Sequence, residues 1–281
     1  MSNSSLHLLG TAAALAVALA AVPLQAAPAV MQGGGTGLLD PVVEFYGTDD
    51  RVPVNTSLMP FSAIGRLELA SGAHCTGALV APRIVLTAAH CIYFEDSVRI
   101  DQPTQFHAGY SKGRSVATAN AVEWFASAGY DSINHLHDVE LDGFDWAFIT
   151  LDQPIGDVAG MLDIMPDLSA DILLDAVRHV WSPISSGYSG DKDQIQTAHT
   201  GCPILKVWDD NTFYHQCDIM PGNSGGPLLM ERDGRMWIIG VHSTKSHDDK
   251  GIAIDGMAVD ARAFAAAFDK YRNYVAARYH D

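Results

Sequence analysis

The chain has 281 residues, of which 48% are hydrophobic and 18% charged, so its composition is that of a folded globular protein and excludes a disordered one. Its formal net charge of -16 at pH 7 argues against a nucleic-acid partner, because binding to the phosphate backbone requires clustered Lys and Arg. An acidic balance of this kind is typical of a soluble surface that resists aggregation.

The amino terminus has the pattern of a secretory signal peptide. Residues 8–22 are an apolar run too short for a typical membrane span, and small residues follow, so residues 1–26 are expected to be cleaved after Ala26. The run has no preceding Lys or Arg, and a membrane anchor of similar length is the alternative. Cleavage predicts a secreted or periplasmic protein with no stable membrane association. Residues 27–42 contain three consecutive glycines and are typical of a spacer or short propeptide before a domain at 43–281.

From Arg51 onward, short β-prone runs alternate with turn residues, which indicates an all-β sandwich or barrel. The predicted strands are Ile64–Leu69, Thr76–Val80, Ile84–Thr87, Trp146–Leu151, Val177–Trp181, Ile204–Trp208, Pro227–Met230, Trp237–Val241 and Ile252–Val259. Residues 154–175 have little strand signal and are expected to link two halves. Apolar residues recur at helical spacing over Ala261–Arg278, which predicts an amphipathic helix that is capped by Asp260 and packs on the β-structure rather than on a partner.

The four cysteines are Cys75, Cys91, Cys202 and Cys217. An even number behind a signal segment indicates disulfides formed in an oxidising compartment. Spacing favours Cys75 with Cys91 and Cys202 with Cys217, although other pairings are open. The alternative of a zinc site lacks a Cys-x-x-Cys pair, and the His-Leu-His-Asp run at 135–138 lacks a third ligand at a suitable spacing, so we expect no metal and no other cofactor.

Two segments carry the candidate chemistry: Thr87-Ala88-Ala89-His90-Cys91 and Pro221-Gly222-Asn223-Ser224-Gly225-Gly226-Pro227. A serine hydroxyl is a weak nucleophile at neutral pH and needs a neighbouring base, which itself needs an orienting carboxylate. We therefore predict Ser224 as the nucleophile and His90 as the base, held in place by the disulfide of Cys91. Because glycine permits sharp turns, the amides of Gly222 and Ser224 are expected to face the same oxyanion.

The string Thr-Ala-Ala-His-Cys resembles the histidine motif of the trypsin-like serine proteases, and Gly-Asn-Ser-Gly-Gly-Pro resembles their serine motif. The resemblance runs from about Arg51 to the carboxyl terminus. It implies two six-stranded antiparallel β-barrels packed together, at about 58–155 and 175–259, followed by a carboxyl-terminal helix at 261–278. It also implies a monomer that cleaves protein or peptide substrates.

The acid of the triad is best placed at Asp145, because an Asp that leads an apolar strand is that family's usual setting. Asp138, Asp142 and Asp152 compete, but no strand follows Asp142, and Asp152 comes after the strand. The Gly-x-Ser-x-Gly pattern also matches the nucleophile elbow of α/β-hydrolases. In that fold the serine opens a helix, whereas here Pro227 and a strand-like run follow it, so we reject that alternative.

The sequence leaves open which substrate residue is preferred before the scissile bond. Gly47–Arg51 with the Asn-Thr that follows resembles the start of bacterial glutamyl endopeptidases, and Gly240–Ser243 resembles their segment whose histidine contacts an acidic substrate side chain. His242, with Ser243 beside it and Lys245 adding positive potential, would then bind Glu or Asp.

Asp218 gives the opposite signal, because it lies six residues before Ser224, where trypsin has the Asp that binds Lys or Arg. A basic preference is therefore an alternative. Asp218 otherwise orients His242 and raises its pKa, or points away from the pocket.

The resemblance also bears on activation. Asn223 stands where trypsin has an Asp that pairs with the new amino terminus, and an Asn cannot form that ion pair. In the glutamyl branch the mature amino terminus helps to bind the acidic side chain, and the corresponding terminus here lies near Val43. A protease-fold binding protein without catalysis is the alternative function, although all three triad members are present.

Overall fold

The structure is a computed structural model that describes residues 44–93, 99–131, 143–178 and 183–280. The predicted signal segment and spacer lie outside these residues. The strands are β1 (Val52–Pro53), β2 (Ile64–Leu69), β3 (His74–Ala81), β4 (Ile84–Thr87), β5 (Pro103–Ala108), β6 (Ala117–Ala126), β7 (Ala147–Leu151), β8 (Asp163–Ile164), β9 (Ile184–Gly187), β10 (Thr197–Thr200), β11 (Ile204–Val207), β12 (Thr212–His215), β13 (Pro227–Arg232), β14 (Arg235–His247) and β15 (Ala253–Asp260). The helices are α2 (Gly156–Ala159), α3 (Ala170–Arg178) and α4 (Ala261–Tyr279), with short 3-10 turns η1 (Phe61–Ala63), η2 (Ala89–Cys91) and η3 (Gly190–Lys192).

The first half is a closed barrel in the order β2-β3-β4-β7-β6-β5. Its strands alternate between buried apolar and more exposed polar residues, so that Leu67 is fully buried while its neighbours Arg66 and Glu68 are half-buried. Phe106 of β5 is fully buried opposite Leu67 of β2, and the two side chains help to fill the interior. Closure leaves no free strand edge in this half.

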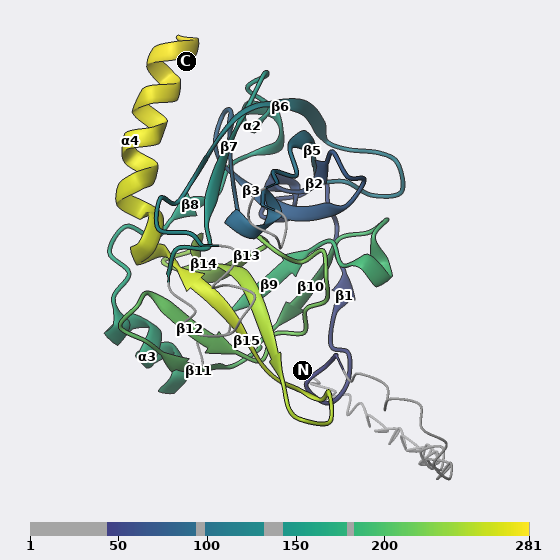
Figure 1. Cartoon of the computed structure of the whole chain (residues 1–281), viewed down its shortest axis with the longest axis vertical. Helices are drawn as coiled ribbons and strands as arrows, with labels where there is room; N and C mark the ends of the chain where they lie inside the picture. The colour runs from purple at the N-terminus through teal and green to yellow at the C-terminus, as the bar shows by residue number, and fades with distance from the viewer. Residues whose placement is uncertain (1–43, 94–98, 132–142, 179–182, 281) are drawn as a thin grey trace, which may run out of the picture. The chain divides into compact units, whose positions relative to one another are not determined.

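The second half is a nine-stranded sheet ordered β1-β10-β9-β13-β14-β15-β12-β11, with β8 added in parallel to β14. The all-β class expected from the sequence is confirmed, with a carboxyl-terminal helix. The second half differs in detail from a six-stranded barrel, because short strands extend its sheet. Figure 1 shows the first barrel above this sheet, with β9, β13 and β14 on the side of the sheet nearer the barrel.

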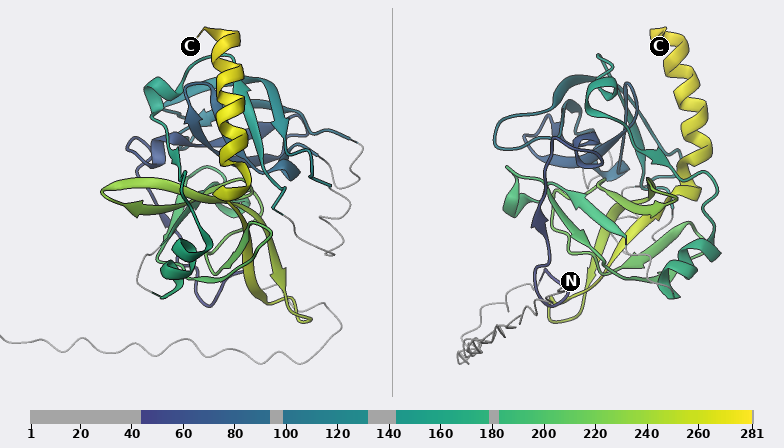
Figure 2. Two further views of the ribbon diagram at one scale, coloured as in Figure 1. Left: turned by 90° about the vertical axis from the view of Figure 1, so that its left-hand side faces the viewer. Right: turned by 180° about the vertical axis from the view of Figure 1, so that it is seen from behind.

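Helix α4 follows β15 directly and runs along the side of the first barrel (Figures 1 and 2). The side chain of Asp260 accepts a hydrogen bond from the N–H of Arg262 and caps the first turn, as expected. The predicted apolar stripe is buried, and its members are Phe264, Phe268, Tyr271 and Val275. The Tyr271 hydroxyl lies 2.7 Å from the Thr150 hydroxyl of β7, so α4 is joined to the barrel wall by a buried polar contact.

One predicted strand is wrong. Val177 and Arg178, at the start of the expected strand Val177–Trp181, belong to helix α3, and the rest of that range lies outside the described residues. The N–H of Ile172 donates to the Ser169 hydroxyl, which starts the helix. This capping side chain, and the apolar residues at helical spacing behind it, outweighed the β-branched valine.

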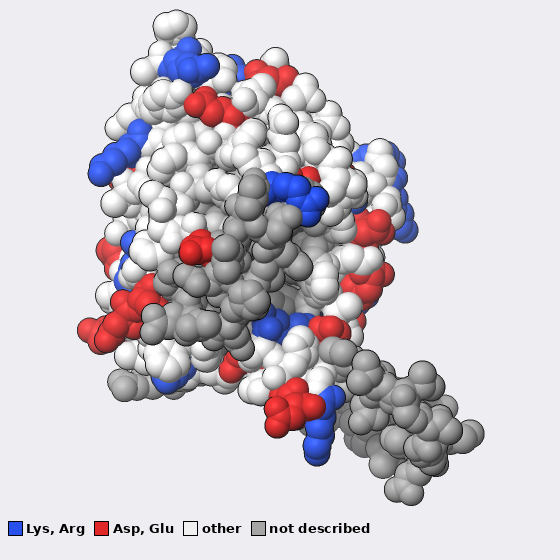
Figure 3. All heavy atoms as spheres, in the orientation of Figure 1, with Lys and Arg blue, Asp and Glu red and all other residues white. Residues whose placement is uncertain are grey.

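No helix among the described residues is long and apolar enough to cross a membrane. Figure 3 shows acidic and basic side chains interspersed on the face toward the viewer, as befits a chain with a net charge of -16 that carries both signs.

Candidate active site

Strand pairing places His90 beside Asp145. Strand β4 runs antiparallel to β7, with Thr87 opposite Ala147. His90 follows the end of β4, and Asp145 precedes the start of β7, so the two side chains meet at the same edge of the barrel. Nδ1 of His90 lies 2.7 Å from Oδ2 of Asp145, and the backbone N–H of His90 donates to Oδ1 over 2.9 Å.

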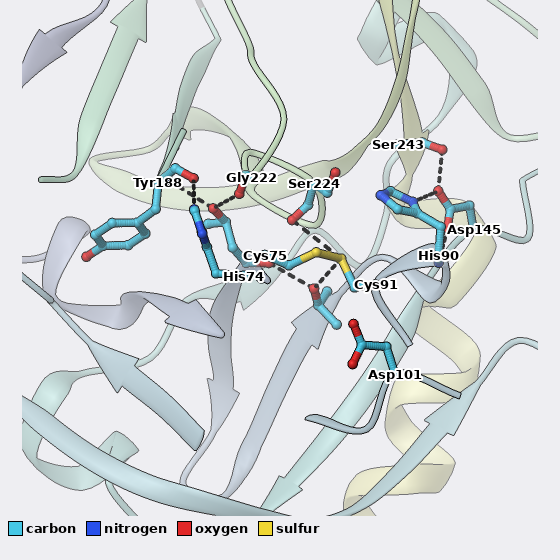
Figure 4. Close-up of a disulfide and its surroundings, with 12 residues drawn as sticks. His74, Cys75, His90, Cys91, Asp101, Asp145, Tyr188, Gly222, Ser224 and Ser243 are labelled. Atoms are coloured by element: carbon cyan, nitrogen blue, oxygen red, sulfur yellow. Dashed lines mark hydrogen bonds and ion pairs between the residues drawn. A yellow bond between two sulfur atoms is a disulfide. The ribbon is translucent and has the colours of Figure 1, made fainter. Parts of the chain in front are cut away.

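Asp145 is buried, with its side chain 2% exposed, and it accepts a further hydrogen bond from another strand. The Ser243 hydroxyl of β14 donates to the same Oδ2 that faces His90. Figure 4 shows the chain of contacts from Ser243 through Asp145 to His90, whose ring points toward Ser224. Because three donors surround the carboxylate, it is fixed as an ionised acceptor that orients the imidazole.

The two effects on the pKa of His90 oppose one another. Burial lowers the pKa because it disfavours the imidazolium ion, but the charge of Asp145 and the hydrogen bond to it raise the pKa above its ordinary value. The net effect is a more basic imidazole. Such a group is suited to accept a proton from a hydroxyl.

The turn that carries Ser224 is held by backbone contacts to both halves. The Ser224 carbonyl accepts from the N–H of Thr76 in β3 over 2.9 Å, and the N–H of Gly225 donates to the carbonyl of His242 over 2.9 Å. Gly225 has a φ of 74°, and a Cβ there would lie 2.1 Å from the hydroxyl oxygen of Thr87. Only glycine therefore permits this turn to approach the end of β4, next to His90.

Two backbone N–H groups of this turn remain open. Within the described part of the chain, neither Gly222 nor Ser224 donates its N–H to a protein acceptor, whereas Asn223 between them donates to the Met220 carbonyl over 2.9 Å. The Asn223 side chain accepts from the N–H of Met220 over 3.1 Å and so stabilises the loop on itself. The two free N–H groups suit the binding of a negatively charged oxygen.

His90 and Ser224 line one pocket of ≈ 790 Å³ together with residues of β14 and the loop before the serine turn. Its lining also includes Glu44, Met220, His242, Ser243, Lys245 and His247. Lys245 supplies an ammonium group to this pocket, and Asp218 is absent from the lining.

The chain is similar to proteins that are already known. The Trypsin family model matches residues 53–266. The chain belongs to the trypsin family. As a member of that family it is a serine endopeptidase, which is a hydrolase that acts on proteins.

Individual relatives point to one branch of the trypsin family. Glutamyl endopeptidase of Bacillus licheniformis is 27% identical over 235 residues, which is 81% of this chain and 68% of that protein. Serine protease 23 of Mus musculus is 25% identical over 214 residues, which is 69% of this chain and 52% of that protein. The solved structure of a Glu endopeptidase in complex with MPD superposes with a TM-score of 0.64 at 27% identity, covering 84% of this chain and 100% of that one.

Only one of the competing acids described in the structure contacts the histidine. Asp152 instead accepts hydrogen bonds from the backbone and the side-chain amide of Asn120, over 2.9 and 2.8 Å. Asp138 and Asp142 lie outside the described residues. The contacts therefore single out Asp145 as the acid beside His90.

The disulfides of this trypsin-family chain follow the pairing that the spacing favours. Cys75 is joined to Cys91, next to His90, and Cys202 is joined to Cys217. The first bond ties η2 to strand β3. Cys91 Sγ also lies 3.8 Å from the carbonyl oxygen of Ser224, so this disulfide packs against the serine turn.

His242 differs from the expectation. It is almost fully buried, and its Nε2 lies 2.7 Å from the Ser185 hydroxyl, while its Nδ1 lies 3.2 Å from Nε2 of His215. The N–H of Cys217 donates to Nδ1 of His215 over 3.1 Å, which leaves the His215 proton on Nε2 and makes His242 Nδ1 an acceptor. Burial lowers the pKa of His242 to about 3, so the imidazole is neutral at pH 7 and would meet a substrate carboxylate only as a hydrogen-bonding group.

Of the roles weighed for Asp218, the structure agrees with the last, in which its side chain points away from the pocket. Its oxygens accept backbone hydrogen bonds from Tyr46, over 3.1 Å, and Asp50, over 2.8 Å, and Oδ2 lies 3.2 Å from Nδ1 of His199. The suggestion that Asp218 orients His242 or raises its pKa is therefore wrong. Asp218 points away from the pocket and anchors the amino-terminal segment to the second sheet.

Ser243 and Lys245 lie in the pocket wall, as the sequence suggested. The Ser243 hydroxyl is engaged by Asp145, so it acts on the acid rather than directly on a substrate. Lys245 is 9% exposed at its side chain and pairs with the carboxylate of Glu44. Sequence reasoning missed Glu44, because its partner is 201 positions away and nothing local marks it.

Two groups of described residues have metal-ligand types close together. One is Cys75, His90 and Cys91, whose sulfurs form a disulfide and cannot ligate as thiolates. The other is Asp50, His199 and Asp218, and the Asp218 oxygens already accept backbone hydrogen bonds. The 135–138 run weighed as a metal site lies outside the described residues.

Proposed function

We propose that the chain is an exported endopeptidase in which His90, Asp145 and Ser224 form the catalytic triad and which prefers Glu, and less readily Asp, before the scissile bond. His90 takes the hydroxyl proton of Ser224 as the serine oxygen attacks the substrate carbonyl carbon. The N–H groups of Gly222 and Ser224 bind the resulting oxyanion. His90 then gives its proton to the leaving amine, and an acyl-enzyme remains.

The second half of the reaction uses the same groups. A water molecule loses a proton to His90 and attacks the ester carbonyl, and His90 returns that proton to Ser224 as the acid product leaves. Asp145 stays ionised throughout and stabilises the imidazolium that forms in each half. The contact between Asp145 and His90 is the observation that carries the catalytic assignment.

The acidic preference rests on Lys245, which brings a positive charge into the pocket that holds Ser224. Its ammonium would donate charge-assisted hydrogen bonds to a substrate carboxylate. The alternative basic preference loses its support, because Asp218 faces the amino-terminal segment instead of the pocket. The similarity to glutamyl endopeptidases favours the same conclusion.

A serine-directed fluorophosphonate tests the catalytic assignment. The purified protein should be labelled at Ser224, and Ser224→Ala should abolish both labelling and turnover. A folded protein that resists labelling would instead support the alternative of a protease-fold binding protein that has lost catalysis.

A peptide-library digest tests the preference. We expect cuts after Glu, and Lys245→Met should lower kcat/KM for a Glu substrate by roughly tenfold to a hundredfold, the range of a lost hydrogen bond to a charged group. The matched control is Lys250→Met, which removes the same charge from an exposed position in the turn after β14. Cuts mainly after Lys or Arg would overturn the acidic preference.

Export and maturation complete the proposal. The disulfides fit an oxidising compartment, secreted or periplasmic. Amino-terminal sequencing of the exported protein should begin close to Val43, which lies outside the described residues, and not at Ala27. A protein that begins at Ala27 would retain the proposed spacer.

A further inference from the structure

The ammonium group of Lys245 is already surrounded by acceptors from its own chain. Its Nζ donates to the backbone carbonyls of Ile219, over 2.7 Å, and Glu44, over 2.9 Å, and it forms an ion pair with the Glu44 carboxylate. A lysine has three N–H donors. Three acceptors face these donors, and two of them belong to Glu44.

The Glu44 carboxylate also meets a second basic side chain of β14. Its Oε2 lies 3.4 Å from Nε2 of His247, and both residues line the pocket. Burial raises the pKa of Glu44, but the hydrogen bond and charge of Lys245, with His247, lower it below its ordinary value. Glu44 is therefore ionised at neutral pH and supplies a full negative charge to this pocket.

The backbone after Glu44 is firmly held. Asp218 accepts the N–H groups of Tyr46 and Asp50, and the ring of Phe45 stacks under the guanidinium of Arg51, with 4.6 Å from Cζ to the ring centroid. Arg51 is itself paired with Asp49 and Asp191. Because the segment is tied down within a few residues, the Glu44 side chain has a high effective concentration at Lys245.

We propose that Glu44 is an internal competitor for the substrate carboxylate, a carboxylate of this chain that occupies the cation of the specificity pocket. This inference rests on the proposed acidic preference. A substrate Glu gains Lys245 only by displacing Glu44, so Glu44 sets how tightly acidic side chains bind. A mature chain that begins near Val43 retains Glu44, so the competitor remains in the processed enzyme.

Peptide binding to the full chain tests the proposal. The Ser224→Ala protein cannot form an acyl-enzyme, so a fluorescent peptide with Glu before the scissile position remains intact while anisotropy reports its Kd. Adding Glu44→Gln removes the charge and keeps the backbone carbonyl that contacts Lys245. We expect this change to tighten Kd for the Glu peptide by roughly tenfold, about the effect of losing one competing hydrogen bond between charged groups.

The controls separate competition from a change in folding. A peptide with Gln in place of Glu should change in Kd by less than about twofold, because it carries no charge for Lys245. Glu231→Gln makes the same substitution on an exposed position of β13 and should change neither Kd. In the Lys245→Met background, Glu44→Gln should no longer tighten the Glu peptide, because the contested cation is gone.

The outcomes distinguish this proposal from the proposed specificity. If the Glu peptide were bound more tightly than the Gln peptide by the same factor with and without Glu44→Gln, only the internal competitor would be overturned. If neither the parent nor the Glu44→Gln protein bound the Glu peptide more tightly than the Gln peptide, both the acidic preference and the internal competitor would be overturned. Weaker binding of the Glu peptide after Glu44→Gln would also overturn the competitor, since Glu44 would then support the site.

Discussion

His90 and His242 occupy two regions of the same cleft and have opposite electrostatic surroundings. Burial lowers the pKa of both imidazoles. At His90 the carboxylate of Asp145 outweighs burial and raises the pKa. The His242 ring contacts the neutral groups of Ser185 and His215 and no carboxylate among the described residues, and its pKa falls to about 3. A single carboxylate thus decides whether a buried histidine is a base or a fixed neutral hydrogen-bonding group.

The same contrast gives the two histidines opposite links to stability. The raised pKa of His90 contributes stability below its ordinary pKa, and this contribution is lost as pH rises through the folded-state value. The lowered pKa of His242 contributes stability above 6.5, and this is lost as pH falls from there toward about 3. His90 therefore favours folding in acid, and His242 opposes it.

The largest expected effect on activity comes from removing the carboxylate charge beside His90, so that this histidine, like His242, lacks a carboxylate partner among the described residues. Asp145→Asn removes the carboxylate charge and favours the wrong tautomer of His90, so kcat should fall about 10⁴-fold. The matched control is Asp152→Asn, at the other end of β7, where the side chain contacts Asn120. Steady-state kinetics on a Glu peptide measures both. Near-full activity in Asp145→Asn would refute the assignment of the acid.

Each region lies next to a disulfide, which allows the two to be weakened separately. Replacing Cys75 and Cys91, or Cys202 and Cys217, with alanine opens loops with sequence separations of 16 and 15. Each double variant should lose roughly 3 kcal/mol of unfolding free energy in the chain-entropy model, measured by urea titration in the Ser224→Ala background. Mass spectrometry of unreduced peptides supplies the check on pairing, which a Cys75–Cys202 link would contradict.

The pH dependence of the unfolding free energy that His242 contributes can be measured directly. Between about pH 6 and 4 the unfolded chain protonates this histidine and the folded chain does not, so the unfolding free energy should fall by about 1.4 kcal/mol per pH unit from this group. In the Ser224→Ala background, His242→Gln should reduce the slope by that amount relative to its parent. An unchanged slope would mean that His242 is protonated in the folded protein.

The smallest expected effect concerns the serine that joins the two regions, since Ser243 follows His242 and donates to Asp145. Ser243→Ala removes one hydrogen bond to the carboxylate and leaves both contacts with His90, so kcat should fall by only about tenfold. Ser57→Ala, at an exposed position in the first half, is the control and should match the parent. A loss as large as that of Asp145→Asn would show that the Asp145 orientation depends on Ser243.

The residues around His90 could be predicted from the sequence because they lie in short local motifs. Strands β2 and β4 match their predicted ranges residue for residue, and the histidine and serine motifs lie where these strands and turns bring them together. Strands β5 and β6 were missed, because exposed polar residues such as Gln105 and Asn120, which hydrogen-bond to each other, interrupt their apolar residues.

The surroundings of His242 and Lys245 could not be predicted in the same way. They depend on contacts between distant parts of the chain, such as Asp218 with Tyr46, which lie 172 positions apart. The sequence offers the chemical types of these residues but not their partners. The sequence alone does not distinguish a buried histidine from an exposed one, or a paired lysine from a free one. The structure distinguishes them because it shows where the amino-terminal segment lies.

Helix α4 links the outside of the first barrel to the proposed catalytic acid. Phe268 and Tyr271 pack on Phe148, and Tyr271 meets Thr150, in the strand that begins two residues after Asp145. Because closely packed side chains transmit displacements to their neighbours, the position of Asp145 depends in part on a helix whose described contacts include neither His90 nor Ser224.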